Sequence, residues 1–515
     1  MNWAERVEQA LARGDLRRAA SLAGEWQRAA PEDPVAAHKA ADIAFRRFEF
    51  MHAERMYRIC LARDPARWPA WLNLAFIERL LGRPEGWLEA MRAAIARCPD
   101  RALAARLHSS VLVHLHSWPS MSQHTLAAEI RAWAAQHLAP AASRTEATPP
   151  PNQAPSPPRP LRVGYVSGNY GGAILSALLP SVLAAHDREV VAPTLVSTSQ
   201  GLRTAPPVFA STGLPFLAVS AEGMAQMLRG RFDVLVDLDG HTPTGNLPQW
   251  TERMAPVQLS WLDWVNTTGT PGMDGYISDA VSTPPELAAT FTERVWLLPF
   301  FRLPFHVPDW LRQAPTPRAS ATGGFAFGCF SRLDKLHDSL LASWGRILGA
   351  VPGSSLVLKS GLFDAESVRT IFTERLARHG IDRSRLRFLG KTDYRAHLMA
   401  YAQVDLVLDS WPYNGGVSTF DALAMGAPVL GLLGETPVGR QTAAILQNCG
   451  LHSLRASNVE DYVQRAIDFG LGASALPARA SVREALLGSP ATDAPRFARA
   501  LEAIYLQALA ESRAT

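Results

Sequence analysis

The arrangement of apolar and polar positions divides the chain into three parts of different character. Residues 1–138 show no strand-like alternation and are rich in Ala, Leu, Arg and Glu, which favours helices. Residues 139–160 contain eight prolines, a composition that predicts an extended, semi-rigid linker. From residue 161 onward, short apolar runs alternate with helical stretches, as in parallel sheets whose faces are covered by helices.

The helical part repeats itself at a spacing of 34 residues. Three sets of positions follow this spacing. One set is Pro31, Pro65 and Pro99, the second is Gly14, Phe48 and Gly82, and the third is Ala19, Ala53 and Trp87. A turn glycine, a small packing residue and a closing proline at this period indicate tetratricopeptide repeats. About three repeats fit, and such solenoids usually bind peptides or protein partners. The alternative is a generic helical bundle, because Phe48 and Trp87 depart from the small-residue pattern.

The apolar runs after the linker form two series, which predict two Rossmann-like lobes with a ligand at the carboxyl ends of the strands. The predicted strands are 161–167, 190–197, 233–240 and 257–264 in the first series, and 325–330, 354–360, 385–390, 405–410 and 428–433 in the second. An amphipathic segment, 495–509, predicts a last helix packing across the lobes. We therefore divide the chain into helical repeats (1–138), a linker (139–160), a first lobe (161–315), a second lobe (316–490) and a C-terminal helix (491–515).

Composition narrows the class of protein. A length of 515 residues predicts two to four domains, and a net charge of +4 is too weak to indicate a nucleic-acid partner. The four cysteines are scattered and form no CxxC pair, which fits a reducing compartment and argues against structural zinc. The first residues are charged from Glu5 onward and no run of about 18 apolar residues occurs, so we expect neither a signal peptide nor a membrane span. We expect a cytoplasmic protein.

The segment 408–426, LDSWPYNGGVSTFDALAMG, holds the first candidate chemistry. It predicts a strand, a loop of small polar residues and then a helix whose N-cap is Ser418 or Thr419. A helix N-terminus offers unpaired N–H groups and partial positive charge to a phosphate, and Gly415 and Gly416 let the backbone approach closely. Asp421 can accept hydrogen bonds from ribose hydroxyls. The alternative is a plain strand–loop–helix turn with an ordinary cap.

Three further side chains in the second series are candidates. Arg440 lies in another Gly-led loop before a helix, within residues 434–446. Lys335 follows the first strand of the series and can reach a diphosphate, although a surface lysine is the ordinary alternative. His397 precedes strand 405–410 on a predicted helix, where the alternative is a solvated helix residue.

In the first series, residues 237–246 follow a strand and carry the pattern Asp237-Leu238-Asp239 of metal-dependent sugar transferases. We expect no metal here, because the first Asp belongs to the strand and nothing nearby completes a ligand set. His241 at the strand end can act as an acid or base, or it can be a structural His that bonds a loop carbonyl. The Gly/Thr-rich loop in 261–279 is suited to lining a cleft, with Asn266, Thr267, Thr268 and Gly269.

These motifs, taken in order, resemble glycosyltransferase family 41, the protein O-GlcNAc transferases and Spindly proteins. The resemblance covers nearly the whole chain and rests on LRVGYVS, DLDGHT, APVQLSWLDWVNTTGTPGMDGYISD, the Lys335 loop, LDSWPYNGGVSTFDALAMGAPV and GET. DGHT, NTTGTPGMDGYISD and PFFRLP are closer to the Spindly branch. The resemblance implies a tetratricopeptide solenoid followed by tandem Rossmann-like lobes of the GT-B type, with the first lobe (161–315) on the acceptor side and the second lobe (316–490) binding the nucleotide sugar. It also implies an inverting, metal-independent transfer of a sugar from a nucleotide diphosphate to Ser or Thr of a protein, without a cofactor.

The resemblance also implies roles for single residues. Lys335 matches the lysine that stabilises the leaving diphosphate, Asp421 the ribose-binding acid and His397 a histidine beside the base. Gly416, Val417 and Ser418 stand where O-GlcNAc transferases carry His-Thr-Thr. The expected set of donor-binding residues is His397, Asn414, Gly415, Gly416, Val417, Ser418, Asp421, Thr436 and Arg440, with Lys335 and His241 as the catalytic candidates.

One departure from the family concerns the loop after residue 167. Ala173 and Ala177 stand where O-GlcNAc transferases carry histidines, so His241 would have to substitute or leaving-group stabilisation would have to suffice. The expected donor is UDP-GlcNAc, or GDP-fucose if the Spindly motifs decide, and the expected partner is a protein or peptide acceptor guided by the repeats. The alternatives are a scaffold that binds nucleotide sugars without catalysis, or a transferase acting on a lipid or glycan.

Overall fold

The computed structural model describes residues 2–138, 159–313 and 324–514. The chain forms two compact units, each made of separate segments. Unit 1 comprises Met1–Val111, Arg332–Gly349 and Leu358–Thr392, and unit 2 comprises Leu112–Ser331, Ala350–Val357 and Asp393–Thr515. The linker predicted over 139–160 lies outside the described residues except for its last two positions, and so does the predicted boundary between the lobes at 315 and 316.

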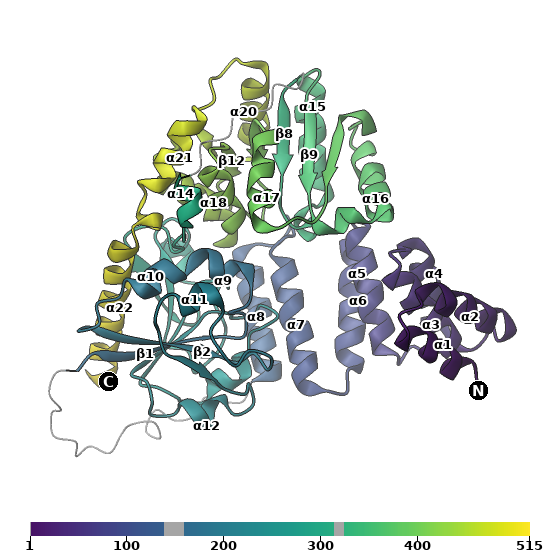
Figure 1. Ribbon diagram of the computed structural model, residues 1–515, viewed down its shortest axis with the longest axis horizontal. Helices are drawn as coiled ribbons and strands as arrows, with labels where there is room; N and C mark the ends of the chain where they lie inside the picture. The colour runs from purple at the N-terminus through teal and green to yellow at the C-terminus, as the bar shows by residue number, and fades with distance from the viewer. Residues whose placement is uncertain (1, 139–158, 314–323, 515) are drawn as a thin grey trace. The chain divides into compact units, whose positions relative to one another are not determined.

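The N-terminal region is helical, as the sequence predicts, and its helices follow one another as pairs (Figure 1). They are α1 (Trp3–Ala12), α2 (Leu16–Ala29), α3 (Pro34–Arg46), α4 (Phe50–Arg63), α5 (Trp68–Leu80) and α6 (Pro84–Arg97), followed by α7 (Arg101–Leu115) and α8 (Gln123–His137). The second helices of the three pairs, α2, α4 and α6, have the same length and begin 34 residues apart. The predicted repeat is therefore confirmed as a structural period, and the helical pairs fit tetratricopeptides.

The turn inside each pair shows the same period in its backbone. Gly14, Phe48 and Gly82 have φ of 73°, 61° and 74°, the left-handed region that glycine adopts without strain. Phe48 keeps this conformation although it carries a side chain, so the turn geometry is set by the repeat and not by the residue at its tip. Ala19 and Ala53 are fully buried, as expected of small residues where two helices approach closely.

The first sheet has seven strands in the order β3-β2-β1-β4-β5-β6-β7. They are β1 (Leu161–Ser167), β2 (Val191–Ser197), β3 (Phe216–Ala218), β4 (Val234–Asp237), β5 (Val257–Ser260), β6 (Gly275–Asp279) and β7 (Arg294–Leu298). Each neighbouring pair is parallel, with Leu161 opposite Val191 and Ser167 opposite Ser197. The helices among them are α9 (Ala173–Leu178), α10 (Pro180–Ala184), α11 (Pro207–Ala210), α12 (Met224–Leu228), α13 (Pro285–Ala288) and α14 (Asp309–Gln313).

The second sheet has six strands in the order β10-β9-β8-β11-β12-β13. They are β8 (Ala326–Cys329), β9 (Ser355–Lys359), β10 (Leu386–Leu389), β11 (Leu406–Leu408), β12 (Val429–Leu432) and β13 (Arg455–Ala456). Its helices are α15 (Asp338–Ala350), α16 (Glu366–Ala377), α17 (Tyr394–Met399), α18 (Val417–Ala424), α19 (Gln441–Asn448), α20 (Val459–Leu471) and α21 (Arg479–Leu487). Both sheets reverse their strand order after the first strand of the series, the arrangement of Rossmann folds, whose ligands bind at that switch point. The predicted two-lobed α/β architecture is confirmed.

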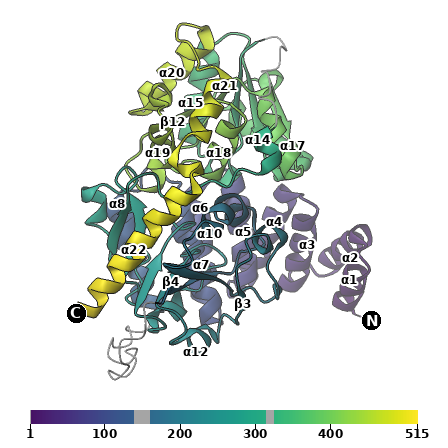
Figure 2. The ribbon, with the colours of Figure 1, turned by 60° about the vertical axis from the view of Figure 1, so that its left-hand side comes forward.

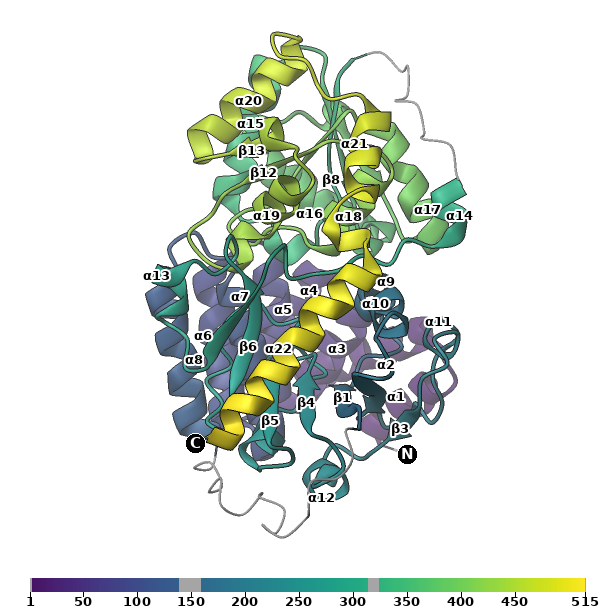
Figure 3. The same cartoon turned by 90° about the vertical axis from the view of Figure 1, so that its left-hand side faces the viewer.

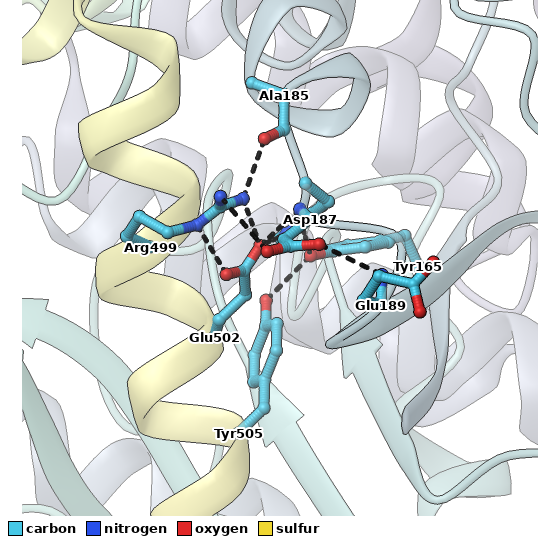
Figure 4. A network of polar contacts seen from close by, with 8 residues as sticks. Tyr165, Ala185, Asp187, Glu189, Arg499, Glu502 and Tyr505 are labelled. Atoms are coloured by element: carbon cyan, nitrogen blue, oxygen red, sulfur yellow. Dashed lines mark hydrogen bonds and ion pairs between the residues drawn. The ribbon is translucent and has the colours of Figure 1, made fainter. Parts of the chain in front are cut away.

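The last helix, α22 (Ala494–Ala514), corresponds to the helix predicted over 495–509 and crosses the first sheet beside β5 and β7 (Figures 2 and 3). A buried polar network fastens it there (Figure 4). The hydroxyl oxygens of Tyr165 in β1 and Tyr505 lie 3.0 Å apart, and Glu502 accepts a hydrogen bond from the backbone N–H of Asp187. The Glu502 carboxylate also lies 2.8 Å from the ring of buried His186. No helix in the described ranges combines the length and apolar character needed to cross a membrane.

Candidate functional site

The loop after β11 is held rigidly by its own polar groups. The backbone N–H of Gly415 donates to both carboxylate oxygens of Asp409, at 2.9 and 3.1 Å. The side chain of Asn414, fully buried, donates to the carbonyl of Ser410, and its backbone N–H donates to the carbonyl of Val438. Asn414 and Gly415 therefore shape the loop, which lies at the switch point of the second sheet.

This loop leads into α18, whose first turn is open. The N-cap is Gly416 (φ −121°, ψ −85°), and no side chain caps the helix. The prediction that Ser418 or Thr419 is the N-cap is wrong, because the helix already begins at Val417 and the Thr419 hydroxyl lies 2.8 Å from that of Thr442. Within the described part of the chain, the backbone N–H groups of Val417 and Ser418 have no acceptor. They form, with the helix dipole, a site suited to an anion.

Asp421 lies one turn further along α18 and is buried. The Tyr394 hydroxyl donates to its Oδ1 at 2.8 Å, and Nε2 of His397 lies 3.8 Å from its Oδ2. Burial raises the pKa of the Asp421 carboxyl to about 7, and the hydrogen bond from Tyr394 opposes that shift. The structure thus places Asp421 and His397, two separate candidates from the sequence, beside each other, and it adds Tyr394, which the sequence did not single out.

The second Gly-led loop uses its polar groups on protein backbone. The Thr436 hydroxyl accepts a hydrogen bond from the N–H of Gly439. The Arg440 guanidinium donates from Nε to the carbonyl of Val281, at 2.6 Å, and from Nη1 to that of Gly434, at 3.0 Å. Val281 follows β6 of the first sheet, so Arg440 ties the two lobes together within unit 2. Donor binding by Thr436 and Arg440 stays a prediction.

Lys335 ends a short 3₁₀ turn, Leu333–Lys335, in the segment that follows β8. Its side chain is buried, so it is no ordinary surface lysine. Lys335 belongs to unit 1, whereas the loop from Asp409 to Asp421 belongs to unit 2. Its role toward a diphosphate stays a prediction.

His241 occupies a structural position. Its ring is buried between Trp133 and Trp264, with ring centroids 4.4 and 4.8 Å away. Its Nε2 lies 2.9 Å from the carbonyl oxygen of Thr268. This geometry favours the alternative of a His that bonds a loop carbonyl, and its catalytic role stays a prediction.

The loop with Asn266, Thr267, Thr268 and Gly269 faces inward, since the first three side chains are fully buried. Glu293, also buried, accepts hydrogen bonds from the Thr267 hydroxyl at 2.5 Å, from the backbone N–H of Thr268 at 2.6 Å and from the Thr268 hydroxyl. The Asn266 side chain bonds Gln123 of α8. These buried, hydrogen-bonded side chains stabilise the interior of the first lobe. Neither Glu293 nor Gln123 carried a sequence signal, because both contacts join residues far apart in the chain.

The Asp-Leu-Asp pattern also serves the backbone. Asp237 accepts from the N–H of Gly240 at 2.9 Å, and Asp239 accepts from the Ser167 hydroxyl at 2.6 Å and the N–H of Gly168 at 2.7 Å. Burial raises the pKa of both carboxyls, that of Asp237 to about 8 with help from the neighbouring Asp239 charge. Across the described ranges, no three His, Cys, Asp or Glu residues are grouped as they would be around a metal ion.

Asp239 thereby fixes the loop after β1 that leads into α9. Ala173, the first residue of α9, is exposed, and Ala177 is buried with its carbonyl accepting from the N–H of His306. α9 lies in contact with α18. Ala173 and Ala177 therefore lie on a helix that contacts α18, and the absence of family histidines at these two positions stays a prediction.

Comparison with known proteins gives a consistent result. The family model described as "Glycosyl transferase family 41" matches residues 143–313 and 321–501. A relative from Arabidopsis thaliana, "Probable UDP-N-acetylglucosamine--peptide N-acetylglucosaminyltransferase SPINDLY", is 32% identical over 360 residues, 68% of this chain and 39% of the relative. The SEC protein of the same plant, also named as a probable UDP-N-acetylglucosamine--peptide N-acetylglucosaminyltransferase, is 27% identical over 67% of this chain and 37% of its own length.

Among solved structures, an O-GlcNAc transferase mutant from Thermobaculum terrenum superposes with a TM-score of 0.80 at 27% identity, covering 99% of this chain and 97% of that one. This chain spans only about two fifths of the length of the two plant relatives, 39% of SPINDLY and 37% of SEC.

Proposed function

The chain belongs to glycosyl transferase family 41, and on that premise we propose that it transfers a sugar from a nucleoside diphosphate donor to Ser or Thr hydroxyls of a protein. The acceptor oxygen attacks the anomeric carbon, the bond from that carbon to the diphosphate oxygen breaks, and the diphosphate leaves with the electron pair. The proton of the acceptor hydroxyl passes to the departing diphosphate or to solvent. Attack opposite the leaving group inverts the anomeric configuration. The relatives named as peptide N-acetylglucosaminyltransferases support a protein acceptor.

The open N-terminus of α18 carries this proposal. The uncapped N–H groups of Val417 and Ser418 suit a diphosphate, and the loop behind them is fixed by Asp409 and Asn414. Asp421 offers a buried carboxylate one turn away, at a suitable place for the ribose hydroxyls, and His397 adjoins it for the base. A diphosphate, a ribose and a base are the parts that donors of this class share.

We propose UDP-GlcNAc as the donor, on the names of the relatives, and we retain GDP-fucose because several motifs are closer to the Spindly branch. The repeats at the N-terminus suit the protein acceptor, since tetratricopeptides bind extended peptides. The reaction as proposed needs neither metal nor cofactor. We assign the protein to the cytoplasm, which the four free cysteines support.

A scaffold that binds nucleotide sugars without turning them over is the second candidate, and Ala173 favours it. The methyl side chain at the start of α9, beside α18, cannot exchange a proton with an acceptor hydroxyl. Under the transferase proposal, the main rate enhancement instead comes from stabilising the leaving diphosphate, which gains charge in the transition state.

Lys335→Ala tests this assignment. Purified protein is incubated with UDP-GlcNAc or, in a parallel arm, GDP-fucose, and the released nucleotide is measured together with donor affinity. We expect turnover to fall about 100- to 1,000-fold, the loss typical of removing one such charge-stabilising group, with a much smaller change in affinity. Lys391→Ala, at an exposed lysine of the same unit, is the matched control. Unchanged turnover in Lys335→Ala would contradict the role of Lys335, and donor binding without turnover in the unaltered chain would favour the scaffold.

A further inference from the structure

A buried arginine in unit 1 contacts both the third helical repeat and the segment that carries Lys335. Arg375 of α16 is 2% exposed. Its Nη1 donates to the carbonyl of Leu80, the last residue of α5, at 3.3 Å. Its Nη2 donates to the carbonyl of Leu336 at 2.7 Å and to Oδ1 of Asp338 at 2.8 Å. One guanidinium therefore joins three segments that are distant in sequence.

The turn of the third repeat is shaped to receive this side chain. A Cβ atom added to Gly82 would lie 2.7 Å from Cζ, Nε and Nη2 of Arg375. The equivalent glycine of the first repeat, Gly14, has nearly the same φ, 73° against 74°, and a Cβ there would meet nothing within 4 Å. The two turns share a backbone conformation and differ in whether a guanidinium packs on the glycine.

The other contacts of Arg375 lie directly beside Lys335. Leu336 is the next residue, and its N–H bonds the carbonyl of Leu333, which closes the 3₁₀ turn that ends at Lys335. Asp338 begins α15, and its second carboxylate oxygen lies 3.7 Å from Nε2 of His379. Helix α5 also contacts the turn Leu333–Lys335. A displaced guanidinium would free the backbone on the carboxyl side of Lys335.

We propose that Arg375 is a positioning residue that holds the Lys335 segment in its working geometry by bridging it to the turn of the third helical repeat. The inference rests on the proposed function, because it takes Lys335 to act on the leaving diphosphate. It adds a mechanical consequence of the fold: a shift of the third repeat reaches Lys335 through the carbonyls of Leu80 and Leu336.

The test compares Gly82→Ala with Gly14→Ala in the full chain, using the released nucleotide from UDP-GlcNAc and, in parallel, GDP-fucose. Both variants carry the same left-handed strain, so both should lower the unfolding temperature of the repeats, but only Gly82→Ala pushes against Arg375. We expect kcat to fall about 10- to 100-fold in Gly82→Ala, as for a catalytic group misplaced by about 1 Å, with donor KM little changed. Gly14→Ala should keep the kcat of the unaltered chain.

Arg375→Lys gives a second reading, since lysine keeps the charge but cannot serve three acceptors in a fixed plane. It should lower kcat as Gly82→Ala does, and adding it to Lys335→Ala should cause no further loss. Where Arg375→Lys does not fold, Gly82→Ala still tests the contact with Arg375 in place. Two results would overturn this inference and leave the proposed function standing. One is an unchanged kcat in Gly82→Ala. The other is that Arg375→Lys lowers kcat by the same factor in Lys335→Ala as in the unaltered chain. Full turnover in Lys335→Ala, or none in the unaltered chain, would overturn the proposed function and the inference with it.

Discussion

Removal of the Tyr394 hydroxyl should move the pH dependence of donor binding in a predictable direction. Tyr394 donates to Oδ1 of Asp421, whose carboxyl has a pKa of about 7 because it is buried. If the ionised carboxylate accepts the ribose hydroxyls, donor KM must rise as pH falls below about 7. Tyr394→Phe removes a hydrogen bond that favours the ionised form, so the pKa of Asp421 rises and the inflection moves to higher pH.

The size of this effect follows from the contact. A hydrogen bond to a charged group contributes about 1.5–3 kcal/mol, and about 1.4 kcal/mol corresponds to one pH unit. Tyr394 is 40% exposed, which places the effect at the lower end, about one pH unit. At pH 7 the carboxyl is then about half ionised in the unaltered chain and about one tenth ionised in the variant, so KM differs about fivefold. Above pH 9 the Asp421 carboxyl is ionised both in the unaltered chain and in Tyr394→Phe, so the KM values of the two proteins should converge.

The assay is steady-state release of nucleotide from UDP-GlcNAc and GDP-fucose between pH 5.5 and 9.5. Asp421→Asn is the control, because it lacks the titrating group and should give a weak donor affinity that does not vary over this range. Identical inflections in the unaltered chain and Tyr394→Phe, or a KM that is flat with pH in both, would refute the ribose role of Asp421.

Three further predictions concern stability. Phe48→Gly should raise the free energy of unfolding of the repeats by about 1 kcal/mol, because glycine adopts the left-handed backbone conformation without the strain that an exposed phenylalanine has there. Chemical denaturation measures this change, and no gain in stability would contradict the strain argument. Glu293→Gln should lower the free energy of unfolding by about 1–3 kcal/mol. The amide can keep its one oxygen on the N–H of Thr268, but it then turns its NH2 toward the Thr267 hydroxyl, which already accepts from the N–H of Thr292 and loses its acceptor. Exposed Glu189→Gln is the control, and equal melting temperatures would count against the inward-facing loop. The pKa of Asp237 is raised from 3.8 to about 8, so the folded protein binds this proton more tightly than the unfolded chain does. The free energy of unfolding should therefore decline as pH rises from about 4 to about 8, and it should decline less in Asp237→Asn. If the unfolding temperatures of the unaltered chain and of Asp237→Asn change with pH in parallel, Asp237 does not titrate in this range.

The regular parts of the fold could be predicted because their signals are local. The 34-residue period survives at Phe48, where the turn keeps its left-handed backbone without a glycine. Long buried strands such as β1 and β2 can be recognised in the sequence as largely apolar runs. The strands β3, β6, β7 and β13 were not predicted. β3 and β13 have only three and two residues, and β7 carries exposed positions. β6 has five buried residues, but it lies in the segment 261–279, which its Gly and Thr residues led us to interpret as a loop.

The candidate site could be predicted in composition but not in detail. The sequence singled out Asp421 and His397 for separate roles, and the structure adds that they lie 3.8 Å apart. The sequence put the N-cap of α18 at Ser418 or Thr419, whereas it is Gly416. Capping propensity favours a hydroxyl residue, whereas here the hydroxyl of Thr419 lies against Thr442 of α19.

Long-range partners could not be predicted from a single chain. Glu293 and Arg375 each act on residues at least 25 positions away, and nothing in their own surroundings marks them. The same limit applies to His241, which the sequence left open between catalysis and structure and which the structure surrounds with Trp133 and Trp264.

The central claim is that the chain moves a sugar from a nucleotide onto protein, and intact-mass analysis tests it most directly. Proteins from cells that express the unaltered chain are compared with those from cells that express Lys335→Ala. We predict that particular proteins gain the mass of one N-acetylhexosamine, or of one deoxyhexose if the donor is GDP-fucose, only with the unaltered chain. Masses that are the same in both, together with a purified protein that binds either donor but releases no nucleotide, would contradict the claim.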